Sequence, residues 1–468
     1  MENNDNSGAI NAQLHELFLQ SSGVCTDTRK IVQGSIFFAL KGETFNGNDF
    51  AEKAIEQGAN YAVVDDIKYS NSCEILPDNK FIYVPNVLET LQQLARYHRL
   101  KHRIPIIAIT GTNGKTTTKE LITSVLKKKY NVVATEGNLN NHIGVPLTLL
   151  KINENTQVAV VEMGASAPGE IKTLVNIVCP TFGLITNVGK AHLLGFGSLE
   201  GVKQTKGELY DNLMEHKKIA FVNVDNPNLT SMLKERIDLQ IVPYGVNNDM
   251  AKILPYGESD PYLKIQIPNP IYGTNLIEEY HDNTCRNITI PTHLIGNYNI
   301  DNVLAALCVG THFGIALNEA IEAISSYIPT NNRSQMIKTS NNIIIVDAYN
   351  ANPTSFKASL ENFKSLDMSH KTLIIGDMLE LGEESLKEHI TILNLAISLQ
   401  PEHIFIVGNE FKKAFEQEQL NKNISTQITL YRDVEELKTH FLMEQPKGKA
   451  FLIKGSHGIH LEKLIDIL

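Results

Sequence analysis

The segment from Ile106 to Glu120, IIAITGTNGKTTTKE, constrains the fold of this chain more than any other. It begins within an apolar run, residues 104–110, that has the length and β-branched content of a buried strand. A glycine-containing turn follows, and after it apolar residues recur at helical spacing. The first backbone N–H groups of a helix have no partner within the helix and can bind an anion. A strand, a glycine turn and a helix N-terminus therefore predict a phosphate-binding loop.

This loop and the helix start carry the groups that bind a nucleoside triphosphate. Lys115 offers a point charge for the β- and γ-phosphates, and the hydroxyl of Thr116 can ligate magnesium. The general phosphate-loop pattern has a glycine where this chain has Ile109. The alternative to a phosphate-binding loop is therefore a short turn between a strand and a helix that happens to carry Gly-Lys-Thr. We predict that ATP and Mg²⁺ bind here. The residues expected to contact the phosphates are Gly111, Thr112, Asn113, Gly114, Lys115, Thr116 and Thr117.

Length, charge and cysteine content narrow the class of protein. The 468 residues predict about three domains, and the net charge of −10 argues against a general nucleic-acid-binding protein. The first residues, MENNDNSGAI, lack the basic and apolar regions of a signal peptide, and no apolar run approaches the length of a membrane span. The scattered cysteines suggest neither a disulfide framework nor a zinc site. They are Cys25, Cys73, Cys179, Cys285 and Cys308. We therefore expect a cytoplasmic enzyme.

The order of apolar runs predicts an α/β fold in three domains. Residues 1–86 are expected to form a small N-terminal α/β domain, and residues 87–328 a central P-loop domain with a parallel sheet. Short alternating runs at residues 250–295 suggest an antiparallel addition to the central domain. A linker at residues 329–332 opens the C-terminal domain, residues 329–468, which alternates strands and helices in a Rossmann-like unit without a GxGxxG turn.

Three residues beyond the loop are candidates for the site. Glu162 ends the apolar strand VAVVE, and an acid at the carboxyl end of a strand parallel to the P-loop strand can hold magnesium. The alternative is an acid that simply faces solvent. His192 follows the next strand, but a lone histidine is more often structural, and magnesium prefers oxygen ligands. The sequence around Lys206, taken alone, predicts a surface lysine on a charged helix.

The loop TGTNGKTTT resembles that of the Mur ligases, which build the peptidoglycan precursor, and further similar segments run along the whole chain. NVGKAHLLGFGSLEGVKQTKGELY is similar to the family segment in which a histidine and a lysine enter the active site. The resemblance implies that Lys115, His192 and Lys206 are catalytic and that Lys206 is carbamylated by carbon dioxide. A neutral, desolvated amine can react in this way, and the product is an anionic oxygen ligand. The implied magnesium ligands are Thr116, Glu162, His192 and Lys206.

The resemblance also implies contacts with the nucleotide and the substrate. TDTRKIVQGSIFFALKGETFNGNDF is similar to a uridine-nucleotide-binding segment, and ATEGNLNNHIGVPLTLL to a loop near the muramyl peptide and magnesium. IGNYNIDNVLAAL resembles an adenine-contacting segment, and NRSQMI and VDAYNANPTS resemble parts of the third domain that lie over the nucleotide. The implied nucleotide contacts are Asn299, Asn302, Arg333 and Asp347. The implied substrate contacts are Thr28, Arg29, Asn46, Gly47, Asn138, Asn140, Asn141, Tyr349 and Asn350. His457 and His460 stand where a basic arginine is usual, which leaves substrate contacts there open.

DAYNANP and GDMLELG are most similar to the family members that add D-alanyl-D-alanine. The resemblance therefore implies an ATP-dependent amide-bond ligase that joins D-alanyl-D-alanine to UDP-N-acetylmuramoyl-tripeptide through an acyl phosphate. We expect a monomer that binds no nucleic acid and does not insert into a membrane. The alternatives are a sister ligase that adds another amino acid, a folylpolyglutamate synthase-like ligase, and a non-catalytic nucleotide-binding regulator. Whether the third residue of the tripeptide is diaminopimelate or lysine stays open.

Overall fold

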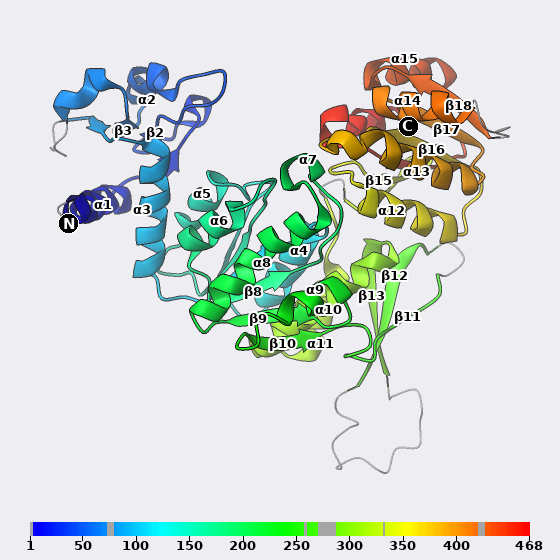
Figure 1. Ribbon diagram of the computed structural model, residues 1–468, viewed down its shortest axis with the longest axis horizontal. Helices are drawn as coiled ribbons and strands as arrows, with labels where there is room; N and C mark the ends of the chain where they lie inside the picture. The colour runs from blue at the N-terminus through cyan, green and yellow to red at the C-terminus, as the bar shows by residue number, and fades with distance from the viewer. Residues whose placement is uncertain (1–2, 73–78, 257–259, 270–286, 331–332, 420–425) are drawn as a thin grey trace, which may run out of the picture.

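The computed structural model describes residues 3–72, 79–256, 260–269, 287–330, 333–419 and 426–468 (Figure 1). The expected α/β fold class is confirmed: each of three parts of the chain is built on a largely parallel sheet. The N-terminal part is blue in Figure 1, the central part cyan to green, and the C-terminal part yellow to red. The domain boundaries themselves stay a prediction. Residues 331 and 332 of the predicted linker lie outside the described residues.

The N-terminal part holds a four-stranded parallel sheet in the order β1-β2-β3-β4. Its strands are β1 (Val24–Cys25), β2 (Ile36–Phe38), β3 (Tyr61–Val64) and β4 (Phe81–Tyr83). Its helical segments are α1 (Asn3–Leu19), η1 (Thr28–Lys30), η2 (Gly47–Phe50), α2 (Ala51–Glu56) and η3 (Ile67–Ser72). Helix α1 was not predicted from the sequence. Helix α3 (Val87–Lys101) then leads into the central part, and the side chain of Asn86 caps it by accepting a hydrogen bond from the Glu89 N–H at 3.0 Å.

The central part contains a six-stranded parallel sheet in the order β10-β9-β8-β5-β7-β6. Its strands are β5 (Ile106–Thr110), β6 (Val132–Ala134), β7 (Val158–Glu162), β8 (Phe182–Ile185), β9 (Ile219–Asn223) and β10 (Gln240–Tyr244). The crossover helices are α4 (Lys115–Leu126), α5 (Gly144–Leu149), α6 (Glu170–Val178), α7 (Leu193–Phe196), α8 (Leu199–Glu215) and α9 (Pro227–Leu233). Because β5 lies between β7 and β8, the loops that follow these three strands meet at one edge of the sheet.

An antiparallel addition follows the central sheet, as the alternating pattern predicted. It comprises β11 (Lys252–Ile253), β12 (Tyr262–Pro268) and β13 (Asn287–Ile295), and Figure 1 shows it below the C-terminal part. Residues 257–259 and 270–286 of the predicted addition lie outside the described residues. The segment η6 (Asn297–Asn299) and helices α10 (Ile300–His312) and α11 (Leu317–Ser326) then return the chain to the central part.

The C-terminal part has a six-stranded sheet in the order β14-β15-β19-β16-β17-β18, in which only β14 is antiparallel to its neighbour. Its strands are β14 (Gln335–Lys338), β15 (Ile343–Asp347), β16 (Lys371–Gly376), β17 (His403–Val407), β18 (Gln427–Tyr431) and β19 (Ala450–Lys454). Its helical segments are α12 (Pro353–Ser365), η7 (Gly382–Glu384), α13 (Ser385–Ser398), α14 (Asn409–Gln419), α15 (Val434–Glu444), η8 (His457–Ile459) and η9 (Leu461–Ile467).

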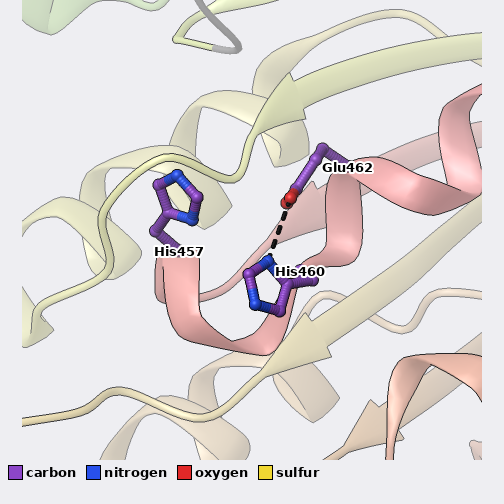
Figure 2. Close-up of side chains that lie close together, drawn as sticks. All are labelled: His457, His460 and Glu462. Carbon is purple, nitrogen blue, oxygen red and sulfur yellow. Dashed lines mark hydrogen bonds and ion pairs between the residues drawn. The ribbon is translucent and has the colours of Figure 1, made fainter. Parts of the chain in front are cut away.

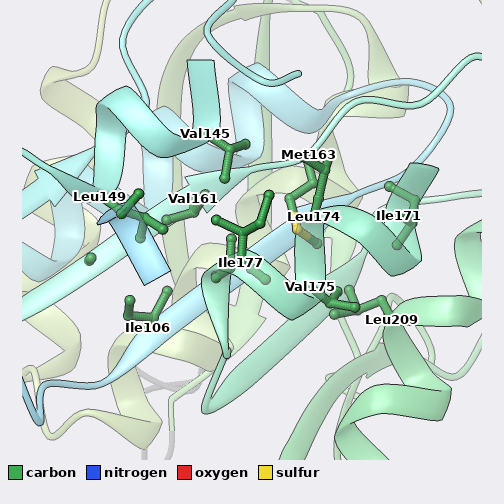
Figure 3. Close-up of a cluster of buried hydrophobic side chains, with 14 of the residues drawn as sticks. Ile106, Val145, Leu149, Val161, Met163, Ile171, Leu174, Val175, Ile177 and Leu209 are labelled. Carbon is green, nitrogen blue, oxygen red and sulfur yellow. The ribbon is translucent and has the colours of Figure 1, made fainter. Parts of the chain in front are cut away.

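A hydrophobic cluster fixes the sheet edge at which the phosphate loop lies. Figure 3 shows Ile106 of β5 and Val161 of β7 in one cluster with Leu149 of α5 and Leu174 of α6. The same cluster continues through α3 to the N-terminal sheet. Each fully buried aliphatic side chain adds about 1.5–3 kcal/mol to the stability of the folded chain, relative to leaving it exposed. These contacts therefore hold the strands and helices rigidly together. No helix in the described part of the chain combines the length and apolar character needed to cross a bilayer.

A buried histidine pair between α1 and α3 makes stability depend on pH. His98 Nε2 lies 2.7 Å from the carbonyl oxygen of Ile152, so it donates there, and Nδ1 lies 3.0 Å from His15 Nε2. Burial lowers the pKa of His98 to about 4. In the unfolded chain this histidine has a pKa of about 6.5. Between these two pKa values, protons therefore bind to the unfolded chain in preference to the folded one. The contribution of His98 to the free energy of unfolding is therefore fully present above about pH 6.5 and is lost as the pH falls towards about 4.

We expect the free energy of unfolding to fall by up to about 3 kcal/mol between pH 7 and pH 4 because of His98. Urea unfolding across this range measures the loss. His98→Gln can still donate towards the Ile152 carbonyl but does not titrate, so its stability should depend less steeply on pH. Equal slopes for the wild type and this variant would contradict the assignment.

Candidate functional site

One large cavity lies between the central and C-terminal parts. Its volume is about 1110 Å³, enough for a nucleotide together with a second ligand. The cavity brings together predicted site residues from loops far apart in the sequence. Those that line it are Thr112, Asn113, Gly114, Lys115, Thr117, Asn138, Asn140, Asn141, Glu162, His192, Asn299, Asn302, Arg333, Asp347, Tyr349 and Asn350.

The phosphate loop has the expected strand–turn–helix form. Gly111 and Gly114 both have positive φ, at 143° and 80°, where only glycine is unstrained. A Cβ atom at Gly111 would lie 2.0 Å from the hydroxyl of Thr186, so the close approach also excludes side chains. Asn187, in the loop that follows β8, holds the turn, since its carbonyl accepts from Thr112 N and its side chain accepts from Asn113 N. The loop is therefore preorganised with its N–H groups at the start of α4.

Lys115 and Thr116 lie at that helix start. The Lys115 ammonium donates to the carbonyls of Gly111 and Thr112 at 2.8 and 3.1 Å, which curls the side chain over the loop. Burial, with Arg333 adding repulsion, lowers the pKa of Lys115 to about 8. An anion in the loop would favour the charged ammonium, so this lysine is suited to bind phosphate.

Oxygen donors meet beside the loop in a way that fits magnesium. The Thr116 hydroxyl donates to Glu162 Oε2 at 2.9 Å, and Asn140 Nδ2 donates to the other oxygen, Oε1, at 2.8 Å. Glu162 is only 1% exposed, so its carboxylate is directed inward rather than into solvent. A hydroxyl and a carboxylate are the ligands that Mg²⁺ prefers. The magnesium ligation predicted for Thr116 and Glu162 is chemically consistent with this geometry.

His192 lies at the cavity wall with a left-handed backbone, φ 49°, just before α7. Its Nδ1 pairs with the carboxylate of Glu380, which comes from the loop after β16 in the C-terminal part. Burial lowers the pKa of His192, although Glu380 opposes the shift. The side chain is therefore oriented by a carboxylate, an arrangement that commonly fixes the tautomer of a metal-binding or catalytic histidine.

Lys206 is not part of the cavity lining. It lies on α8, is 2% exposed, and its ammonium has a long hydrogen bond of 3.4 Å to the carbonyl of Ala165, a residue that does line the cavity. Burial, with Lys115 as a second cause, lowers the pKa of Lys206 to about 7. An amine that is largely neutral near neutral pH and sits just behind the cavity wall fits the chemistry of carbamate formation.

The predicted adenine contacts form a small hydrogen-bond chain behind the loop. Thr118 donates to Asn302 Oδ1 at 2.9 Å, and Asn302 Nδ2 donates to Asn299 Oδ1 at 2.8 Å. Asn299 in turn donates to the Ile295 carbonyl at 2.8 Å. Both asparagines line the cavity, but these bonds already use their side chains within the fold.

The C-terminal part reaches the phosphate loop directly. Arg333 Nη1 donates to the Thr116 hydroxyl at 2.6 Å, and its guanidinium stacks 3.9 Å above the Tyr349 ring. Arg333 Nε is buried and has no hydrogen-bond partner among the described residues, which leaves a donor for a ligand. Asp347 pairs with the fully buried Lys454 at 2.6 Å. The site therefore needs both parts of the chain.

The predicted contacts in the N-terminal part lie away from this cavity. Arg29 is exposed and pairs with Asp27 at 2.8 Å, next to Thr28 in η1. Asn46 caps η2 by accepting from Asn48 N at 3.1 Å. Gly47 leaves no room for a side chain, since a Cβ there would lie 2.3 Å from the Leu40 carbonyl oxygen. The uridine-nucleotide role of these four residues stays a prediction.

Several contacts at the site were not among the predicted residues. Glu380, Lys454, Asn187 and Asn352 orient or neutralise predicted site residues, and Asn352 Nδ2 donates to Asn113 Oδ1 at 2.7 Å. Glu380 lies in GDMLELG, a segment that resembles the family but in which no single residue was predicted to act. Lys454 ends strand β19, three residues before His457. A charged residue at the end of an apolar strand was the signal that could have identified Lys454, as it did Glu162.

Comparisons with known proteins match domains of one family in all three parts of the chain. The Mur ligase middle domain matches residues 109–310, the Mur ligase glutamate ligase domain residues 332–457, and the Mur ligase family catalytic domain residues 20–99. The UDP-N-acetylmuramoyl-tripeptide–D-alanyl-D-alanine ligase of Bacillus subtilis is 35% identical over 449 residues, covering 95% of this chain and 93% of the relative. The ligase of the same name from Rickettsia prowazekii is 32% identical, covering 94% and 93%. A crystal structure of MurF from Acinetobacter baumannii aligns with a TM-score of 0.78 and 28% identity, over 95% of this chain and 92% of that one.

Proposed function

Because this chain belongs to the Mur ligase family, we propose that it joins D-alanyl-D-alanine to UDP-N-acetylmuramoyl-tripeptide in an ATP-dependent reaction of peptidoglycan synthesis. The observation that carries the proposal is the large cavity in which the phosphate loop faces Arg333 and Asp347 of the C-terminal part. An enzyme that activates one substrate with ATP and joins it to another needs such a shared space.

The chemistry explains why ATP is required. A carboxylate is a poor electrophile because its leaving group would be oxide. Transfer of the γ-phosphoryl group to a carboxylate oxygen gives an acyl phosphate and ADP. The amine of D-alanyl-D-alanine then attacks the carbonyl carbon, the carbon–oxygen bond to phosphate breaks, and the amine loses a proton. The products are an amide, ADP and inorganic phosphate.

The residues of the loop would hold the phosphates during the first step. Backbone N–H groups between Gly111 and Thr117 bind the phosphate oxygens, and Lys115 stabilises negative charge on the transferred group. Magnesium would be held by Thr116, Glu162, His192 and a carbamylated Lys206, and it supplies charge neutralisation on the phosphates. Arg333 and Asp347 contact the nucleotide from the C-terminal part, and Asn299 and Asn302 lie on the adenine side.

The proposed substrate contacts come from three regions of the chain. Asn138, Asn140 and Asn141 would contact the muramyl peptide, while Tyr349 and Asn350 approach from the C-terminal part. Thr28, Arg29, Asn46 and Gly47 would bind the uridine nucleotide. Contact between the C-terminal part and the loop excludes water, which otherwise hydrolyses the acyl phosphate. We place the reaction in the cytoplasm and expect the enzyme to act as a monomer.

Acceptor use tests this proposal. With ATP and UDP-N-acetylmuramoyl-tripeptide present, D-alanyl-D-alanine should support continuous ADP release, and D-alanine alone should not. A dipeptide site loses both binding energy and orientation when half of its ligand is missing. Omitting the tripeptide nucleotide is the control. Efficient use of L-alanine, D-glutamate or diaminopimelate would identify a sister ligase instead, and no ADP release with any acceptor would favour a non-catalytic regulator.

A further inference from the structure

A turn after the last strand of the C-terminal sheet gathers three metal-binding side chains. The ligand atoms of His457, His460 and Glu462 all lie within 4.8 Å of one another (Figure 2). Within the described ranges, no other set of three His, Cys, Asp or Glu side chains is this close. The cysteine pattern gave no reason to expect zinc, but these donors are imidazoles and a carboxylate.

The backbone segments that carry this cluster are anchored in the C-terminal part. His457 begins η8, and His460, with φ 60°, joins η8 to η9. Leu461 and Leu464, on η9, are fully buried in the hydrophobic core of the C-terminal part. The donors are therefore carried by a turn whose neighbouring side chains are anchored, so little ordering is needed for an ion to bind.

The three donors remain available to an ion from solvent. Side chains of His460 and Glu462 are 49% and 30% exposed, and His460 Nδ1 lies 3.2 Å from Glu462 Oε1. The adjacent cation, Lys463, pairs with Glu435 at 2.6 Å rather than with Glu462. Among the residues that the structure describes, no lysine ion pair therefore competes with a metal for the Glu462 carboxylate.

We propose that His457, His460 and Glu462 bind a divalent transition-metal ion of the zinc class, at a site distinct from the phosphate loop. Two histidines and one glutamate are a three-ligand set typical of Zn²⁺, which takes a water as its fourth ligand. Mg²⁺ prefers an all-oxygen octahedron, so this cluster selects against it. The site adjoins the cavity wall, because the His457 ring contacts the ring of Tyr349 at a centroid distance of 5.3 Å.

Cobalt and zinc binding to the full-length chain, in buffer with excess Mg²⁺, tests this site. Wild-type protein should bind Co²⁺ with the intense visible absorption of a four-coordinate histidine-containing site, and Zn²⁺ should displace it. His457→Ala and His460→Asn should each weaken Zn²⁺ binding in calorimetry by at least about tenfold, since even changes behind the ligands cost that much. Asn is chosen at position 460 because it tolerates positive φ. Glu462→Gln, which keeps the shape of the side chain, should also weaken binding.

His370→Ala is the matched control. His370 forms an exposed pair with Glu402, but that carboxylate is also bound by Lys449 at 2.6 Å and no third ligand joins them among the described residues. This variant should bind Zn²⁺ as the wild type does. Metal-free melting temperatures establish that each variant is folded. Absence of visible cobalt bands in the wild type, or equal Zn²⁺ affinity in the wild type and all three ligand variants, would overturn the proposal.

Discussion

Lys115→Ala is expected to lower kcat by about a thousandfold, equivalent to about 4 kcal/mol of transition-state stabilisation. The Lys115 ammonium lies over the loop, within hydrogen-bond distance of the Gly111 and Thr112 carbonyls, where the γ-phosphate is transferred in a P-loop enzyme. Its partners belong to the loop rather than to the hydrophobic core, so the melting temperature should change little. Steady-state ADP release measures the effect.

Lys127→Ala supplies the matched control for this prediction. Lys127 is exposed at the other end of the same helix, α4, where it forms the C-cap. Its removal should leave ADP release close to that of the wild type. Near-normal turnover in Lys115→Ala would mean that the strand–turn–helix unit does not bind the transferred phosphate.

Lys206→Ala is expected to be nearly inactive. The pKa of about 7 leaves a large neutral fraction of the amine, which can react with carbon dioxide and become an anionic oxygen ligand. Alanine removes that ligand and leaves space on α8 behind Ala165. A small carboxylic acid added to the buffer should fill this space and restore part of the rate. Lys206→Arg should not be rescued, because its side chain occupies the gap and its cation repels magnesium.

Lys203→Ala separates this role from a general effect on α8. Lys203 lies about one turn earlier on the same helix, its side chain is 21% exposed, and it makes a long ion pair with Glu200 at 3.9 Å. We expect Lys203→Ala to retain activity without added acid. Full activity of Lys206→Ala under the same conditions would rule out the carbamate role and leave Lys206 as a structural lysine.

Local patterns made the central unit predictable. The apolar run before Gly111 and the helical spacing after Lys115 appear in the structure as β5 and α4. The alternating runs at YLKIQIP and NITIP form the antiparallel pair β12 and β13. These predictions succeed because each depends on residues close together in the sequence, where periodicity reports which face is buried. Helix α1 was missed because its first half, NNDNSGA, has no apolar stripe.

Contacts between distant segments could not be read from patterns. Arg333 and Thr116 are 217 positions apart, and His192 and Glu380 are 188 apart, yet each pair is hydrogen-bonded. No periodicity links such residues, because their meeting depends on how the C-terminal part packs on the central part. The resemblance to a family identified three of these four residues, and the partner of His192 emerged only from the structure. Lys206 shows the same limit, because its sequence context did not indicate that it is buried.

Isotope transfer from substrate to phosphate tests the central claim most directly. The enzyme is incubated with ATP, D-alanyl-D-alanine and UDP-N-acetylmuramoyl-tripeptide whose peptide carboxylates carry ¹⁸O. If an acyl phosphate forms and the amine displaces phosphate, one labelled oxygen leaves with each inorganic phosphate while the amide product appears in equal amount. Mass spectrometry of the phosphate and the product measures both. Unlabelled phosphate, or ADP release without the joined product, would contradict ligation through a phosphorylated carboxylate.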